Sequence, residues 1–124
     1  MIKLVLLIGI FFCGLSVVMG AFGAHALKGK LSEYSMSVYN KAVLYQMFHS
    51  SAIIMVVLLT KLVNHHQLYI SAWLFTIGIV IFSGSLYLLS ITGIKWLGAI
   101  TPIGGILLII GWIVMFYVVI SLKI

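Results

Sequence analysis

Long apolar runs separated by short polar breaks make up almost the whole of this chain. An α-helix needs about 20 apolar residues to cross the hydrocarbon core of a bilayer. Four segments meet that requirement, at approximately residues 4–27, 40–61, 68–92 and 101–122. The pattern predicts an all-α integral membrane protein with four transmembrane helices.

The second helix is expected to begin before its apolar run. Ser32 can act as an N-cap, and the negative charge of Glu33 is favourable at the positive end of the helix dipole. The helix then extends over about 32–61, with its first turns in the membrane interface rather than in the hydrocarbon. A short polar turn at residues 64–67 leads to the third helix.

The end of the third helix and the start of the fourth carry similar signals. Gly93 is expected to be a C-cap, since glycine readily adopts the left-handed conformation that ends many helices. Thr101 is expected to cap the fourth helix. Pro102 would then be its first residue, a position at which the missing N–H is not needed.

Short connections force sequential helices to pack as antiparallel neighbours. We therefore expect a single transmembrane domain over residues 1–124, an up-down-up-down four-helix bundle with both termini on one side. The orientation of a membrane protein can be predicted from an excess of basic residues in its cytoplasmic loops. Here the numbers of lysines on the two sides of the membrane differ too little to predict an orientation. Three lie with the termini and four lie opposite: Lys3, Lys61 and Lys123 against Lys28, Lys30, Lys41 and Lys95.

Composition supports lipid as the main surroundings of the protein. Of the 124 residues, 65% are hydrophobic and 6% are charged, which is too little charge to cover a soluble surface of this size. The net charge of +6 comes from lysines that stand singly at the ends of apolar runs. We therefore expect membrane lipids, and no nucleic acid, as partners. The single cysteine, Cys13, allows no intrachain disulfide.

Small residues form stripes on the first and fourth helices. Such stripes let helix backbones approach closely in membranes, either within one chain or between copies of it. Both interpretations stay open from the sequence. We expect self-association, which leucine at Thr101 or Gly105 would disrupt. The stripes comprise Ser16, Gly20, Gly23 and Ala24 on the first helix, and Thr101, Gly104, Gly105 and Gly111 on the fourth.

Polar side chains concentrate on the second helix, within an otherwise apolar segment. Lys41, Tyr45 and His49 recur at every fourth position and so share one face. His49 lies roughly 10 Å into the membrane at about 1.5 Å per residue. Residues of the first and third helices are expected to join them. The candidate polar cluster consists of His25, Lys41, Tyr45, Gln46, His49, Ser50, Ser83, Ser85 and Tyr87, with Tyr39 beside it.

His25 is expected to hold the first helix to the second. Gly20 and Gly23 should let the two helices approach closely at this end. A neutral histidine offers one donor and one acceptor, which suits a bridge between two polar groups where water is scarce. Its imidazole should therefore bond to a polar side chain of the second helix, namely Tyr45, Gln46 or His49.

Ionisable residues inside a membrane are candidates for function, but this set fits reactive sites poorly. A zinc site needs about three or four ligands, and the two histidines within the spans have no thiolate or carboxylate beside them. Two histidines that bind one haem must lie at matching depths in the membrane, and the depths expected for His25 and His49 differ. Histidine catalysis would lack an orienting carboxylate, because the chain has no aspartate. The other two histidines, His65 and His66, lie in the turn at residues 64–67, where we expect them to be solvated. Taken together, these observations lead us to assign no catalytic, cofactor or metal residues.

Elimination leaves two classes of function. The chain has too little loop for a soluble site and too little acid for a proton relay. The first class is a non-enzymatic role in membrane integrity or in association with other membrane proteins. The alternative is binding or transport of a lipid or small molecule by the polar cluster between the first and second helices.

Four short motifs, in this order, resemble those of the YgdD/YwdK-like family. They are GAFGAH (20–25), YQMFHS (45–50), FSGSLY (82–87) and TPIGG (101–105), the last followed by Gly111 and Trp112. This is a family of small bacterial membrane proteins classed as a domain of unknown function, with distant animal relatives. The resemblance implies four transmembrane helices, no established catalytic or cofactor residues, and a bacterial plasma membrane protein with its termini in the cytoplasm.

Overall fold

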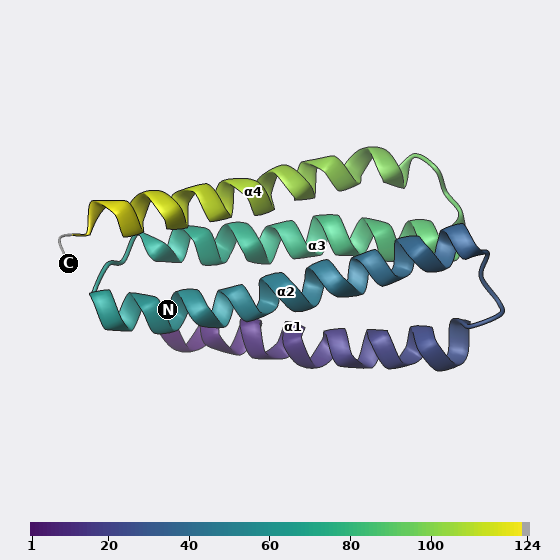
Figure 1. Cartoon of the computed structure of the whole chain (residues 1–124), viewed down its shortest axis with the longest axis horizontal. Helices are drawn as coiled ribbons and strands as arrows, with labels where there is room; N and C mark the ends of the chain where they lie inside the picture. The colour runs from purple at the N-terminus through teal and green to yellow at the C-terminus, as the bar shows by residue number, and fades with distance from the viewer. Residues whose placement is uncertain (123–124) are drawn as a thin grey trace.

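The computed structural model describes residues 1–122 and folds them into four long helices (Figure 1). α1 covers Ile2–Phe22 and continues as a π-helical turn, η1, over Gly23–Leu27; the others are α2 (Glu33–Val63), α3 (Leu68–Thr92) and α4 (Leu97–Ser121). Each helix is long and apolar enough to cross a membrane, which confirms the predicted all-α membrane fold. Lys123, one of the lysines compared for orientation, lies outside the described residues.

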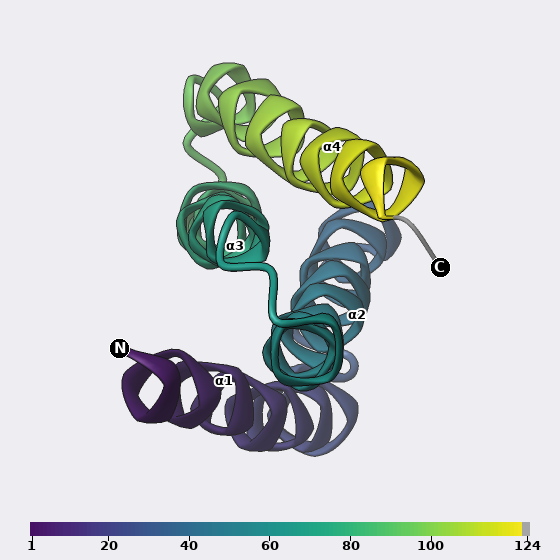
Figure 2. The ribbon, with the colours of Figure 1, turned by 90° about the vertical axis from the view of Figure 1, so that its left-hand side faces the viewer.

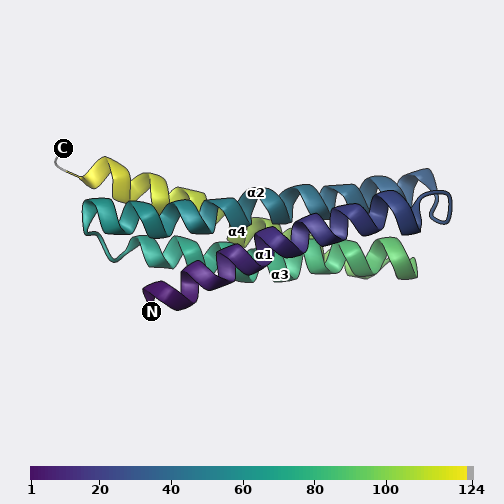
Figure 3. The ribbon, with the colours of Figure 1, turned by 90° about the horizontal axis from the view of Figure 1, so that it is seen from below.

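The helices run up and down, with α2 and α3 in the middle of the molecule. In the end-on view, α1 lies on one side of this pair and α4 on the other (Figure 2). The view from below shows α1 crossing the pair obliquely (Figure 3). The start of α1 and the end of α4 lie toward the same end of the bundle, as does the turn between α2 and α3.

Close backbone packing follows the order of the helices along the chain. Within residues 1–122, α3 packs against both α2 and α4, and α1 packs mainly against α2. In the same part of the chain, α4 makes few or no close backbone contacts with α1 or α2, so the bundle is open rather than square. Its core lies mainly between α2 and α3, where the fully buried side chains include Ile53, Val56, Leu68, Ala72 and Phe75.

The start of α2 agrees with the sequence-based expectation. The Ser32 side chain accepts a hydrogen bond from the backbone N–H of Ser35 at 3.1 Å, and Glu33 is the first helical residue. α2 has 31 residues, a length of about 46 Å at about 1.5 Å per residue, whereas the hydrocarbon core measures about 30 Å. α2 is therefore longer than the hydrocarbon core, as an interfacial start requires.

The boundary between α3 and α4 differs in part from the expectation. Gly93 ends α3 in the left-handed conformation, with a φ of 69°, as predicted. α4 begins at Leu97 rather than Thr101, and Pro102 lies inside the helix. The expected start was wrong because backbone hydrogen bonds over residues 94–99 already begin the helix. Pro102 has no N–H, so one carbonyl of the first helical turn lacks its usual α-helical donor.

The π-helical turn at the end of α1 has no signal in the sequence pattern. A turn of this kind holds more residues than an α-helical turn. The ring of Tyr39 on α2 lies so close to Gly23 that a Cβ at that position would collide with it. The Tyr39 hydroxyl also donates a hydrogen bond to the backbone carbonyl of Met19 at 2.6 Å. These contacts join the end of α1 to α2.

Candidate functional site

Gln46 connects three helices within the predicted polar cluster. Only 2% of this residue is exposed. Its Nε2 donates to the backbone carbonyl of Phe12 on α1 at 3.0 Å. Its Oε1 accepts a hydrogen bond from the Tyr87 hydroxyl on α3 at 2.7 Å. The side-chain amide of α2 is therefore a bridge between α1 and α3.

Two further hydroxyl groups join neighbouring helices. Ser83 on α3 is buried and donates to the backbone carbonyl of Ala42 on α2 at 2.8 Å. Tyr39 bonds to α1, and its ring also meets that of Tyr87 edge to face, with the centroids 5.1 Å apart. Because hydrocarbon offers no hydrogen-bond partners, these bonds satisfy polar groups that would otherwise be costly to bury.

His49 has a hydrogen-bond partner at each ring nitrogen. The indole N–H of Trp112 on α4 donates to its Nε2 at 3.1 Å. Because an indole N–H is only a donor, Nε2 must be the acceptor and the proton of the neutral ring must be on Nδ1. Nδ1 lies 2.9 Å from the backbone carbonyl of Tyr45 and donates to it. The pair of rings therefore joins α2 to α4 where their backbones do not pack closely.

The other predicted serines divide between two interfaces. Ser50 on α2 is fully buried, and its hydroxyl accepts a hydrogen bond from the Cys13 thiol on α1 at 3.3 Å. Ser85 on α3 pairs with Thr101 on α4, with the two hydroxyl oxygens 2.7 Å apart. Ser50 thus belongs with the bonds between α1 and α2, whereas Ser85 serves the interface between α3 and α4.

The expected bond between His25 and α2 was wrong. His25 is exposed, and none of the side-chain hydrogen bonds within residues 1–122 involves it. Gly23 faces α2 and is covered by the ring of Tyr39. Two positions further along is about half a turn, so the His25 side chain lies on nearly the opposite face of the helix. The bonds to α1 come from Tyr39 and Gln46 instead.

Lys41 and Tyr45 also lie outside the bonded cluster. Lys41 is exposed, and it is absent from the side-chain hydrogen bonds of the described residues. Tyr45 is 38% exposed, and its ring packs on that of Phe82 with the centroids 4.5 Å apart. Of the three residues predicted to share one face of α2, only His49 is buried, whereas Lys41 and Tyr45 lie at the surface of the bundle.

The stripe on α4 packs against α3 in the same chain. A Cβ at Gly104 would collide with the backbone of Phe82, and one at Gly111 would press on a phenylalanine ring of α3. Gly105 approaches the ring of Phe82 more loosely, at 3.6 Å from an added Cβ. Leucine at Thr101 or Gly105 would therefore disturb α3–α4 packing, so these substitutions do not isolate self-association.

The stripe on α1 is used in part by α2. Ser16 is buried and its hydroxyl donates to the backbone carbonyl of Cys13 at 2.7 Å. Gly23 is covered by a tyrosine ring of α2, and an added Cβ at Gly20 would lie 3.5 Å from a valine of α2. Ala24 is exposed. Most of the small residues are therefore explained by packing within the bundle.

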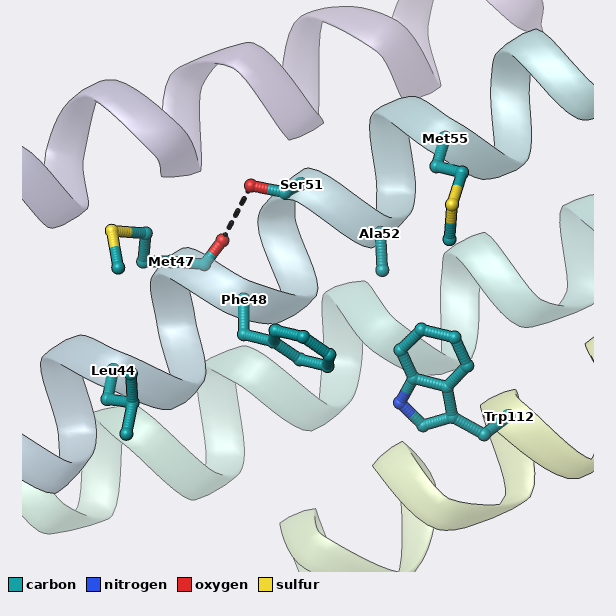
Figure 4. A pocket seen from close by; sticks show the side chains of 7 residues that line it. All are labelled: Leu44, Met47, Phe48, Ser51, Ala52, Met55 and Trp112. Carbon is teal, nitrogen blue, oxygen red and sulfur yellow. Dashed lines mark hydrogen bonds between the residues drawn. The ribbon is translucent and has the colours of Figure 1, made fainter.

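An apolar hollow, called here the outer α2 hollow, lies on the outer surface of α2 and reaches α4 (Figure 4). Its volume is about 410 Å³. The rings of Phe48 and Trp112 meet there with centroids 5.7 Å apart. The Ser51 hydroxyl donates to the Met47 carbonyl at 2.9 Å, the bond drawn in the figure. The lining residues are Leu44, Met47, Phe48, Ser51, Ala52, Met55 and Trp112.

The polar cluster keeps few free groups with which to bind a ligand. Both ring nitrogens of His49 and both polar atoms of the Gln46 amide have partners. Across residues 1–122, no group of three or more His, Cys, Asp or Glu side chains is placed to hold a metal ion. These hydrogen bonds hold the helices together, and each stabilises helix association by roughly 0.6–2 kcal/mol in a bilayer.

Sequence reasoning missed several of the bonding partners. Trp112 did carry a signal, because an indole N–H in the middle of an apolar span must find an acceptor. The thiol of Cys13 is only a weak donor and gives little indication of its role. The carbonyls of Phe12 and Met19 carry no signal at all, since every residue has a carbonyl and only the packing of the helices decides which one is reached.

Known proteins similar to this chain are bacterial membrane proteins. The family model described as "Protein of unknown function (DUF423)" matches residues 19–105. A UPF0382 membrane protein of Staphylococcus haemolyticus is 47% identical over 113 residues, which cover 91% of this chain and 92% of the relative. YwdK, a UPF0382 membrane protein of Bacillus subtilis, is 44% identical over 112 residues, which cover 90% of this chain and 91% of the relative.

These similarities extend over nearly the whole chain and confirm the resemblance seen in its four motifs. No solved structure matches the chain. Four apolar helices and relatives that are membrane proteins establish a multi-pass membrane protein. The chain belongs to the DUF423 family, whose relatives described above are UPF0382 membrane proteins.

Proposed function

We propose that this protein is a non-enzymatic component of the bacterial plasma membrane, acting in membrane integrity or in association with other membrane proteins. The observation that carries the proposal is the pairing of the polar groups of Gln46, His49 and Tyr87. Gln46, His49 and Tyr87 use their polar atoms in hydrogen bonds to other helices. The part of the molecule available to partners is then its lipid-facing surface.

The outer α2 hollow is the part of that surface best suited to protein contacts. Met47 and Met55 are 47% and 43% exposed there, beside Phe48 at 57%. Methionine side chains are flexible and polarisable, and they are frequent at surfaces that adapt to a partner. Aromatic side chains are likewise enriched in the cores of protein interfaces.

A deletion strain tests this proposal when it is scored for membrane potential, lipid composition and sensitivity to detergents. We expect a defect in at least one of these, and wild-type protein should restore it. Met47→Ala combined with Met55→Ala should restore it poorly. The matched control is Leu58→Ala with Leu62→Ala, which changes two exposed α2 positions outside the hollow and should restore it fully.

Two results would contradict the proposal. One is a deletion strain that matches the wild type in all three measurements. The other is substrate-dependent turnover by the purified protein that His49→Ala abolishes, because His49 is a buried histidine and histidine is a common acid–base group in catalysis.

Binding or transport of a lipid or small molecule is a second candidate function. The open arrangement of the bundle favours binding of a lipid, because it leaves apolar hollows between helices at the surface. The polar cluster between α1 and α2 supports it less, since the groups there are already paired. Mass spectrometry of lipid that stays with the purified protein would test this candidate, and lipid-free protein would count against it.

We also propose that both termini face the cytoplasm and that the chain self-associates. The family resemblance supports the orientation, and the large lipid-facing surface supports the association. Labelling of a terminal tag in intact cells tests the orientation, and a tag that reacts from outside would contradict it. Mass measurement in mild detergent tests the association, and a strictly monomeric species at all concentrations would contradict it.

A further inference from the structure

We infer that a groove between α2, α3 and α4, here the α2–α4 groove, binds one phospholipid with an anionic headgroup. This inference rests on the lipid-binding candidate above and is independent of association with other proteins. The groove lies where α2 and α4 begin, at the end of the bundle opposite the turn between α2 and α3. Two hollows of about 430 and 470 Å³ form it. They adjoin, because both are lined by Tyr34, Leu89 and Gly98.

The inner part of the groove is apolar and follows α3. Phe82, Leu86 and Leu89 line it at helical spacings of four and three residues, so they form one continuous face. That face is about 10 Å long at about 1.5 Å per residue. Val38 of α2 and Pro102 of α4 line it as well. A hydrocarbon chain matches such a lining, whereas a polar solute would lose its hydration there without replacement.

Each of the two hollows carries a positive charge. Lys41 of α2 lines one hollow, and Lys95, between α3 and α4, lines the other. Both residues are exposed, and long lysine side chains can lie along apolar surface while the ammonium group reaches the headgroup level. The only acidic residue of the chain, Glu33, lines neither hollow. A headgroup phosphate would therefore complement a charge that the groove itself does not balance.

Two uncharged groups that line the groove, the Tyr34 side chain and the Gly98 carbonyl, can also contact a lipid headgroup. Tyr34 is 70% exposed and lines both hollows, and tyrosine is favoured at the level of lipid headgroups. Gly98 and Pro102 lie four residues apart in α4 and line the same hollow. Because Pro102 cannot donate to the Gly98 carbonyl, this carbonyl lacks its α-helical donor and can accept a hydrogen bond from a headgroup hydroxyl.

The outer α2 hollow provides an internal contrast. Its lining includes exposed apolar side chains but no charged residue. It can therefore contact the acyl chains of any lipid without selecting a headgroup. Selectivity for anionic lipid is expected only in the α2–α4 groove, where the apolar wall and the lysines occur together.

Lipid retention by the purified full chain tests the inference. The protein is placed in nanodiscs of equal parts phosphatidylglycerol and phosphatidylcholine, extracted in mild detergent, and its retained lipid is identified by native mass spectrometry. The wild type should retain one phosphatidylglycerol in preference to phosphatidylcholine. Lys41→Gln and Lys95→Gln should each lower that preference about fivefold, the effect of one lysine near anionic headgroups.

Matched variants separate the groove from general surface charge. Lys28→Gln and Lys30→Gln remove charge near the same end of the bundle but outside the groove, so the preference should stay as in the wild type. Gly98→Leu should prevent retention of either lipid. A Cβ there makes an ordinary contact with Leu89 at 3.7 Å, so the larger side chain extends into the groove. Gly84→Leu is its control, because an added Cβ meets open space there.

Several results would overturn the inference. These are equal retention of the two lipids by the wild type, an equal loss of preference in the Lys28 and Lys30 variants, and displacement of the lipid by inorganic phosphate alone. A lipid-free dimer that Gly98→Leu dissociates would show that a second copy occupies the groove instead. If Gly98→Leu does not fold, the lysine variants decide. Failure here leaves the proposed association role intact, because its complementation test uses the outer α2 hollow.

Discussion

Between α1 and α2, polar side chains reach backbone carbonyls, whereas between α3 and α4 the backbones themselves meet. The Tyr39 hydroxyl bonds to Met19, and the Gln46 amide bonds to Phe12. On the other side of the molecule, Gly104 packs directly on the backbone of α3. The two interfaces lie on opposite sides of the α2–α3 pair (Figure 2).

The difference shows two ways of holding helices together where the hydrophobic effect gives no advantage. Lipid tails are as apolar as leucine, so association depends on close packing and on hydrogen bonds between helices. The α3–α4 interface relies mainly on close packing, with one hydroxyl pair between Ser85 and Thr101. It should therefore be sensitive to added volume, and the polar contacts around Gln46 should be sensitive to the loss of polar atoms.

The largest effect is expected from Gly104→Ala. The added methyl group would collide with the backbone of Phe82, which cannot move as a side chain can, so the free energy of unfolding should fall by about 1–3 kcal/mol. Gly105→Ala is the control, because its methyl group would lie 3.6 Å from the same residue, an ordinary contact. Denaturant unfolding in mild detergent measures both. Equal losses would show that α3 and α4 do not depend on backbone contact at Gly104.

Gln46→Leu should have the next largest effect. It leaves the Tyr87 hydroxyl and the Phe12 carbonyl without their partner, so we expect a loss of about 1–2 kcal/mol in the free energy of unfolding. Gln67→Leu, in the exposed turn before α3, is the control and should change little. An unchanged stability in Gln46→Leu would mean that the amide does not hold α1 and α3 to α2.

Trp112→Phe should have a smaller effect on stability and a clear spectroscopic one. The substitution removes the donor to His49 Nε2, at a cost of about 0.6–1.7 kcal/mol. Nitrogen-15 NMR of the imidazole should show a single neutral form with its proton on Nδ1 in the wild type, and a mixture of both forms in the variant. Trp96→Phe, at a position that is 64% exposed, should leave the spectrum unchanged. A wild-type ring with its proton on Nε2 would refute the assigned bond.

His25→Ala should have the smallest effect. The residue is exposed, and within residues 1–122 it takes no part in the side-chain hydrogen bonds described. The free energy of unfolding should therefore change by less than about 0.5 kcal/mol, as for most surface substitutions. A thermal unfolding scan in detergent is sufficient to measure it. A loss as large as that of Gln46→Leu would restore His25 as a link between α1 and α2.

The helices could be predicted from sequence because apolar length and end signals are local properties. Ser32 and Gly93 mark helix ends as expected. Thr101 and Pro102 misled because the same residues also fit inside a helix: the Thr101 hydroxyl bonds to α3, and a proline near the helix start removes only one bond.

The polar cluster could be predicted only in part. Its members on α2 stand out by composition, and Gln46, His49 and Ser50 are indeed buried. Which partners they find depends on how the helices are rotated about their axes, a property that spacing along one helix does not define. The small residues of α1 indicated that it packs closely on α2. They did not indicate that Tyr39, rather than His25, would fill the space beside Gly23.

A double-mutant cycle between Gln46 and Tyr87 tests most directly whether the polar cluster is structural. Unfolding free energies in mild detergent are compared for the wild type, Gln46→Leu, Tyr87→Phe and the double variant. Because the two side chains share a hydrogen bond of 2.7 Å, we predict a coupling energy of about 0.6–1.7 kcal/mol. Effects that add to within about 0.3–0.5 kcal/mol, as for independent sites, would contradict the account.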